Sequence, residues 1–129
     1  MATWKQVEDY VRANFRIQQE HGDILTMRFE VVGGRTQLVS VRPAVSGEGE
    51  EWIDIISPVG EQDRIDVVRA AEIAETYLCG GVITEGGLVF VRHSAPIVNW
   101  EPEELEHPLS AVLLAADEME KKLLGVDNL

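Results

Sequence analysis

One apolar helix lies between two groups of strands, and its position restricts the folds that this chain can adopt. The segment from about Asp63 to Leu78 has the 3.6-residue periodicity of a helix. Ile65 and Val68 fall outside the main apolar face of this helix, toward its polar side. The first two turns are therefore apolar nearly all round, which is more surface than one sheet can cover. The main face consists of Val67, Ala70, Ala71, Ile73, Ala74, Tyr77 and Leu78.

Two strands joined by a glycine turn are expected early in the chain. Residues 24–32 alternate between apolar and polar side chains, which is typical of a strand with one solvated face. Gly33-Gly34 can supply the positive φ angles of a hairpin turn. The return strand is expected over 35–42 and to end at Pro43, because proline cannot donate to a ladder.

A third strand is expected over residues 51–57, followed by a turn at 58–60 that leads into the central helix. On this strand Trp52 and Ile56 share the face opposite to the other two isoleucines. An ordinary solvated face would be polar, so both faces of this strand are expected to be covered. We therefore predict that Trp52 and Ile56 contact a partner or another subunit.

The remaining segments predict two further helices and a second hairpin. Residues 3–14 form the first helix, with Thr3 and Gln6 in a capping box. Residues 82–84 and 88–93 form a hairpin. The last helix is expected to begin at Pro108, because proline is tolerated in the first turn of a helix.

Together these elements predict a single α+β domain over residues 1–129, without repeats or linkers. Its order is helix, three-stranded antiparallel meander, helix, two-stranded hairpin and long C-terminal helix. The length of 129 residues and the hydrophobic content of 45% are enough for one core.

The net charge of −12 restricts the partners of the chain. Nucleic acids and anionic membranes both require a basic patch, so neither is expected to bind. A basic partner would suit this charge, although many acidic proteins have no such partner. The N-terminal residues have no signal-peptide pattern, and no segment approaches the ~18 apolar residues of a membrane helix. We therefore expect a cytoplasmic protein.

No residue pattern in the chain indicates a reaction, a cofactor or a metal. His21, His93 and His107 lie on three different elements, and no pair has the spacing of a helical metal site. The acidic residues lie in polar runs, where no apolar surroundings raise a carboxyl pKa for catalysis. Cys79 is the only cysteine, and the sequence does not show a histidine base beside it. The expectation is a protein that is not an enzyme.

Three segments resemble a known family. They are the strand pair ILTMRFEVVGGRTQLVSV, the helix RAAEIAETYL, and GLVFVRHSAPIVNW followed by LEHPLSAVLLAADEMEKKL. They resemble the type III secretion chaperone-like fold family, including its branch described as sensory-transduction regulators. This resemblance implies a small acidic cytoplasmic dimer that binds segments of other proteins and has no catalytic residues.

The hypothesis with the most support from the sequence is therefore a chaperone-like homodimer that binds a segment of a partner protein. A two-fold axis across the central helix would bury Ile65 and Val68 against their copies, with Ala71 allowing close approach. Alternatively, the last helix or residues 58–59 cover Ile65 and Val68 within one chain.

A second hypothesis has a different function. The protein would be a small-molecule-binding regulator or a minor enzyme, with a pocket between the sheet and the last helix. That pocket would lie near Tyr77, His93 and Trp100. A deep pocket with converging polar groups would favour this hypothesis, and a shallow apolar groove would favour protein binding.

Overall fold

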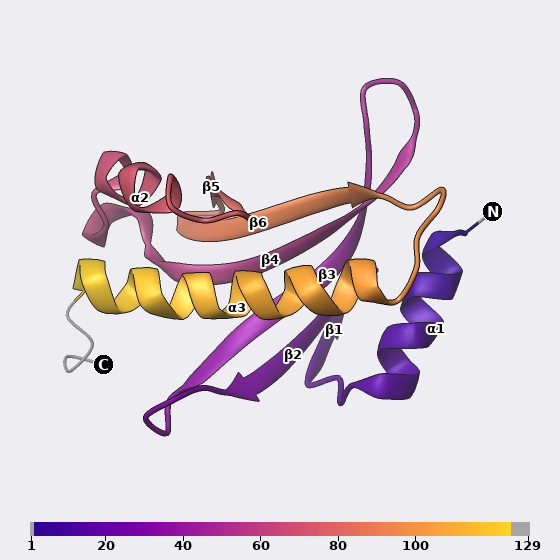
Figure 1. Cartoon of the computed structure of the whole chain (residues 1–129), viewed down its shortest axis with the longest axis horizontal. Helices are drawn as coiled ribbons and strands as arrows, with labels where there is room; N and C mark the ends of the chain where they lie inside the picture. The colour runs from indigo at the N-terminus through magenta and orange to yellow at the C-terminus, as the bar shows by residue number, and fades with distance from the viewer. Residues whose placement is uncertain (1, 125–129) are drawn as a thin grey trace.

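The computed structural model describes residues 2–124 as one antiparallel sheet with helices on one side (Figure 1). The sheet has six strands in the order β1-β2-β3-β4-β6-β5. The expected meander and hairpin thus belong to a single sheet, because β6 pairs with β4. The elements are α1 (Trp4–Asn14), β1 (Gln19–His21), β2 (Ile24–Glu30), β3 (Thr36–Val45), β4 (Glu51–Glu61), the 3-10 helix η1 (Gln62–Arg64), α2 (Val67–Ala74), β5 (Gly81–Glu85), β6 (Leu88–Pro96) and α3 (Glu103–Leu124).

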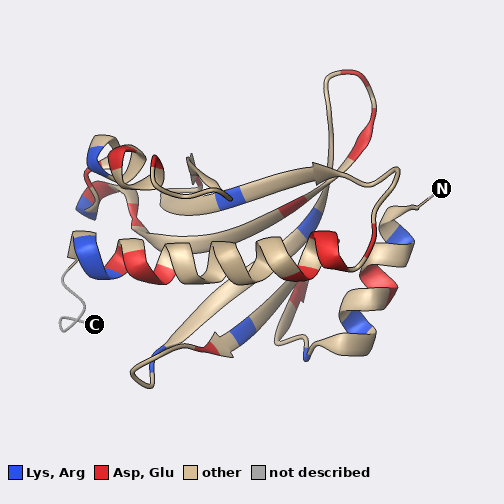
Figure 2. Ribbon diagram, in the orientation of Figure 1, with Lys and Arg blue, Asp and Glu red and all other residues tan. Residues whose placement is uncertain are grey.

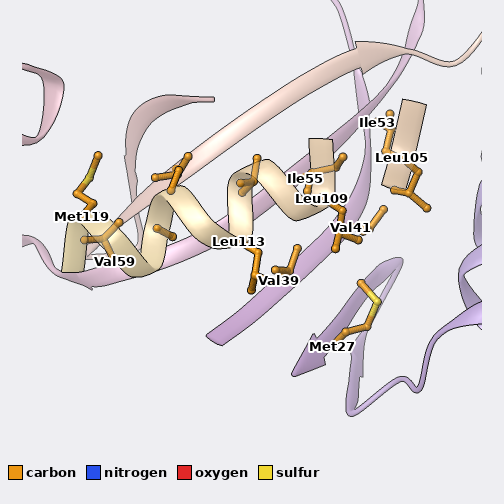
Figure 3. Packing of buried hydrophobic residues seen from close by; sticks show 14 of the residues in the cluster. Met27, Val39, Val41, Ile53, Ile55, Val59, Leu105, Leu109, Leu113 and Met119 are labelled. Carbon is orange, nitrogen blue, oxygen red and sulfur yellow. The ribbon is translucent and has the colours of Figure 1, made fainter. Parts of the chain in front are cut away.

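Helix α3 lies along the sheet, with α1 near its N-terminal end and α2 near its C-terminal end (Figure 1). Its apolar stripe faces the inward side chains of the central strands, as Figure 3 shows. Truncating one such buried leucine typically costs about 2–5 kcal/mol, so this layer is the main source of stability. The buried residues of α3 include Leu105, Leu109, Val112, Leu113, Ala116 and Met119, and those of the strands include Val39, Val41, Ile53, Ile55 and Val59.

Helix α1 begins as its sequence predicts. The Thr3 side chain accepts a hydrogen bond from the Gln6 backbone N–H, and the Thr3 N–H donates to the Gln6 side chain at 2.9 Å. The two bonds satisfy N–H groups that have no partner inside the helix. The buried side of the helix, Val7 and Val11, joins the core.

Helix α2 is shorter than the expected 63–78. Asp66 lies at its N-cap rather than inside it, and the Asp66 side chain accepts a bond from the Arg69 N–H at 3.1 Å. A carboxylate at the N-cap satisfies a free donor of the first turn, which residue periodicity alone does not reveal. At the other end the Thr76 hydroxyl bonds the Ile73 carbonyl at 3.0 Å. Tyr77 and Leu78 therefore lie beyond the helix.

Helix α3 begins at Glu103, so Pro108 lies inside it and the expected start was wrong. Proline in the second turn loses the bond that its own N–H would make, and its ring crowds the carbonyl one turn earlier. Leu105 and Leu109, on either side of it, are buried against the sheet. Packing of these leucines therefore outweighs the local preference against proline.

Two strands continue past the residues expected to end them. Pro43 lies within β3 and pairs with Ile53, but it is beyond Val41, the last residue that pairs with β2. Pro43, which has no N–H to donate, thus lies in a part of β3 that does not pair with β2. The expected turn at 58–60 is instead a bulge in the pairing of β4 with β6.

A buried polar network holds this bulge. The amide of Gln37, whose side chain faces the core, donates to the Ser57 hydroxyl at 2.9 Å and to the Pro58 carbonyl at 2.7 Å. The Ser57 hydroxyl in turn donates to the Leu38 carbonyl at 2.6 Å. The network satisfies backbone groups that the bulge removes from the ladder.

Replacing Gln37 with leucine tests this role. The change leaves the half-buried Pro58 carbonyl without its donor, and it should lower the free energy of unfolding by about 1–3 kcal/mol. Urea denaturation measures the difference. Gln62→Leu is the matched control, because Gln62 is exposed and should change stability little. Equal stability of the two variants would contradict the role of the network.

Candidate functional site

The strand face expected to bind a partner is only partly accessible. Trp52, near the start of β4, is half-buried, and its indole N–H donates to Glu50 at 3.1 Å. Ile56 is only 5% exposed, so its own chain already covers it. The expectation that Ile56 forms an accessible contact is therefore corrected, whereas Trp52 stays a candidate contact.

The three residues expected at a dimer interface also differ in exposure: one is buried and two are exposed. Ile65 is 6% exposed and belongs to the core, because its side chain lies against Gly60 and Leu124. The alternative, in which the chain itself covers Ile65, is therefore the correct one for this residue. Val68 is 71% exposed, and Ala71 is exposed on the same side of α2.

Two open grooves flank α3 instead of one enclosed pocket. The Phe groove lies between α3, the end of α1 and β2, and has a volume of about 350 Å³. In it the rings of Phe15 and Phe29 meet edge to face, with centroids 6.0 Å apart. It is lined by Asn14, Phe15, Phe29, Glu106, Leu109, Ser110 and Leu113.

The second groove, here the Leu groove, lies between α3 and the segment that follows α2, and measures about 320 Å³. Leu78 is fully exposed and Leu114 is 54% exposed. Leu78 was expected on the apolar face of the central helix, but the helix ends before it. The lining residues are Thr76, Tyr77, Leu78, Cys79, Ala111, Leu114, Ala115 and Glu118.

A tyrosine hydroxyl ties each flanking segment to α3. The Tyr10 hydroxyl of α1 donates to Glu106, and the Tyr77 hydroxyl donates to Glu118 at 3.0 Å and to the Ala115 carbonyl at 3.3 Å. The pKa of Tyr77 is raised, chiefly by burial and next by the bond to Glu118. The two bonds set the positions of the walls opposite α3, and so the widths of the grooves.

Between Glu106 and Asp117 the middle of α3 carries no charged residue. Residues 107–116, HPLSAVLLAA, contain no Asp, Glu, Lys or Arg, and Figure 2 shows this stretch in tan between red segments. The exposed part of the stretch, formed by His107, Ser110 and Leu114, is thus an uncharged surface bordered by carboxylates. Sequence periodicity identified the buried side of α3 but not these grooves, because their other walls come from distant segments.

The three residues of the second hypothesis do not share a pocket. Tyr77 lies beside Ala115, whereas Trp100 packs on Tyr10 with ring centroids 5.7 Å apart, at the other end of α3. His93 instead contacts Cys79. No observation therefore supports a small-molecule site formed by these side chains.

Cys79 and His93 form a pair that the sequence did not reveal. The Cys79 sulfur lies 3.2 Å from the His93 Nδ1. Burial raises the pKa of the Cys79 thiol and lowers the pKa of His93. Both shifts favour the neutral thiol and the neutral imidazole, whereas a nucleophilic cysteine requires a lowered thiol pKa. The geometry is that of a half-buried polar contact.

Two features are absent from residues 2–124. No three His, Cys, Asp or Glu side chains gather there in a way that would hold a metal ion. No helix in this range is long and apolar enough to cross a membrane.

Comparison with known proteins identifies the fold. No known family model matches the chain, and no curated protein matches its sequence. A chain in the solved structure of the HopA1–SchA chaperone–effector complex is similar, with a TM-score of 0.61 and 11% sequence identity. The similarity covers 92% of this chain and 94% of that one. The protein therefore has the type III secretion chaperone-like α+β fold that its sequence predicts.

The half-buried His93 predicts a pH dependence of stability. Since the pKa of His93 is lowered in the folded state, the unfolded chain binds protons more readily at this site. The stability that the neutral imidazole contributes is fully present above the unfolded pKa of about 6.5. It is lost as the pH falls from there through the lowered pKa of the folded state. Thermal unfolding of the parent and of His93→Gln, at about pH 7.5 and about pH 5.5, should show a smaller acid effect in the variant. Equal acid effects would contradict the prediction.

Proposed function

We propose that this protein is a non-enzymatic, cytoplasmic, chaperone-like protein that holds a segment of a partner protein. The observation that carries the proposal is the pair of open apolar grooves beside α3, on a fold shared with a chain of a chaperone–effector complex. Open apolar grooves typically bind protein segments, whereas enclosed pockets typically bind small molecules.

The Phe groove is the stronger of the two anchor sites. Phe15, Phe29 and Leu113 line it, and an apolar side chain placed among them would leave water. Burial of apolar area contributes about 25 cal/mol per Å² before the cost of ordering the segment. Asn14 and Ser110 supply polar groups at the rim for the backbone of the bound segment.

Filling the Phe groove should therefore weaken partner binding. Ser110 is exposed on α3 and lines this groove, so Ser110→Arg should obstruct it without disturbing the core. Partners captured by the parent from native cytoplasm are identified by mass spectrometry. Binding of the purified partner segment to each variant is then measured by calorimetry, with at least a tenfold loss expected for Ser110→Arg.

His107→Arg is the matched control, since His107 is exposed one turn earlier and lines neither groove. It should bind the partner segment as the parent does. A partner segment that binds both variants equally would place the site elsewhere, with Trp52 as the next residue to test. Substrate turnover that is lost in Cys79→Ala would contradict the non-enzymatic role.

We also propose that two copies associate through α2. Val68 is a large apolar residue with 71% exposure on a short helix, and the exposed Ala71 beside it would let a second helix come close. Closed two-fold dimers are the commonest assembly of such chains. Ile65 takes no part, because it is buried in the core.

Val68→Asp should convert the dimer into a folded monomer, because a carboxylate buried without a partner at the interface costs several kcal/mol. Light scattering at micromolar concentration measures the mass, and circular dichroism measures folding. Val32→Asp is the control, because Val32 is 83% exposed and lies far from α2 in the β2–β3 connection. A monomeric parent chain would refute the dimer.

A further inference from the structure

Helix α3 forms one wall of both grooves, which lie on either side of it. Ser110 lines the Phe groove and Ala111 lines the Leu groove, although the two residues are neighbours in the chain. Successive residues on a helix are about 100° apart, so the grooves open on opposite flanks of α3. Only the outer ridge of α3 separates them.

That ridge is low and uncharged where the grooves come nearest. Ser110 and Ala111 have small side chains, and the charged residues of α3 lie outside 107–116. Leu114 extends the apolar surface from the ridge into the Leu groove. A chain crossing α3 over Ser110 and Ala111 would meet no charged side chain that must be desolvated.

Each groove contains one carboxylate and no cation. Glu106 lines the Phe groove and Glu118 lines the Leu groove, and neither groove has a Lys or Arg among its lining residues. Each carboxylate accepts a bond from a tyrosine hydroxyl, and Lys122 approaches Glu118 at 3.5 Å. An ionised carboxylate has about four acceptor sites, so both retain capacity for a cationic donor from outside.

We infer that both grooves bind one continuous, extended and basic segment of the partner, which crosses α3 over Ser110 and Ala111. This inference rests on the proposed protein-binding function and specifies the chemistry of the bound segment. One apolar side chain occupies the Phe groove and a second occupies the Leu groove. Lys or Arg side chains beside these anchors reach Glu106 and Glu118. The net charge of −12 favours the approach of such a segment.

The size of α3 determines the spacing of the two anchors. A helix with its side chains is about 10–12 Å across, and the two sets of α3 residues are offset along the axis by about 7 Å. An extended chain rises about 3.3 Å per residue, so about four to six residues should separate the anchors. A single amphipathic helix cannot follow this path, because it cannot bend across the ridge.

Selection from a phage library of random peptides tests the inference without knowledge of the partner. The probe is the full-length protein, and the peptides must be long enough to span both grooves. We expect enriched peptides with two apolar residues at that spacing and with a net positive charge. Shortening the spacing in an enriched peptide should weaken its binding about tenfold or more, as measured by fluorescence polarisation.

Charge-removing variants test the role of the two carboxylates. Glu106→Gln and Glu118→Gln keep an acceptor for the tyrosine hydroxyl but remove the negative charge. Each should weaken the binding of an enriched basic peptide by about two- to fivefold at low salt, with less effect at high salt. Glu48→Gln is the matched control, because Glu48 is exposed in the β3–β4 loop and lines neither groove. It should bind the peptide as the parent does.

Several results would overturn the inference. These are enrichment of acidic peptides, enrichment of peptides with a single anchor, absence of enrichment, and equal binding by all three variants. A change of oligomeric state in Glu106→Gln or Glu118→Gln would also overturn it, since the grooves would then belong to a contact between copies. The proposed function is tested separately: it fails if the binding of every partner segment is unaffected by Ser110→Arg. It survives if a natural partner segment binds at the Phe groove but is not basic.

Discussion

The packing of α3 against the sheet is the contact on which the rest of the structure depends. The buried stripe from Leu105 to Met119 covers the inward side of the central strands, and no other helix within residues 2–124 lies along their length. This packing holds Pro108 inside a helix, which local preference opposes. It also leaves the opposite side of α3 exposed, so the same helix forms the core and presents a surface.

The grooves result from how α1 and α2 meet this helix. Neither is long enough to cover a flank of α3. A bond from Tyr10 to Glu106 ties α1 to α3, and a bond from Tyr77 to Glu118 ties the segment after α2 to it. Apolar side chains such as Phe29 and Leu114 therefore remain accessible beside the core. Apolar surface that stays in contact with water is unfavourable in free energy unless a ligand covers it. This exposed apolar surface, bordered by carboxylates, is the physical basis for assigning a binding role.

The errors made from the sequence share one cause, which is that distant contacts outweigh local patterns. Ile65 reads as a residue on the wrong side of a helix, but it precedes α2 and packs on Gly60 and Leu124. Pro58 reads as a turn, but the amide of Gln37 allows the strand to continue through a bulge. His93 and Cys79 are 14 residues apart in the chain and come together only in the sheet.

The sequence by itself determined the order of the elements other than β1 and η1, the inward faces of the strands and of α3, and the cap of α1 at Thr3. These features depend on alternation, helical periodicity and hydrogen bonds between residues close in the chain, so they can be predicted locally. Tertiary structure alone decided the ends of α2, the burial of Ile56 and Ile65, and the existence of both grooves. A groove requires walls from segments far apart in the chain, and their distance depends on packing that no local pattern encodes.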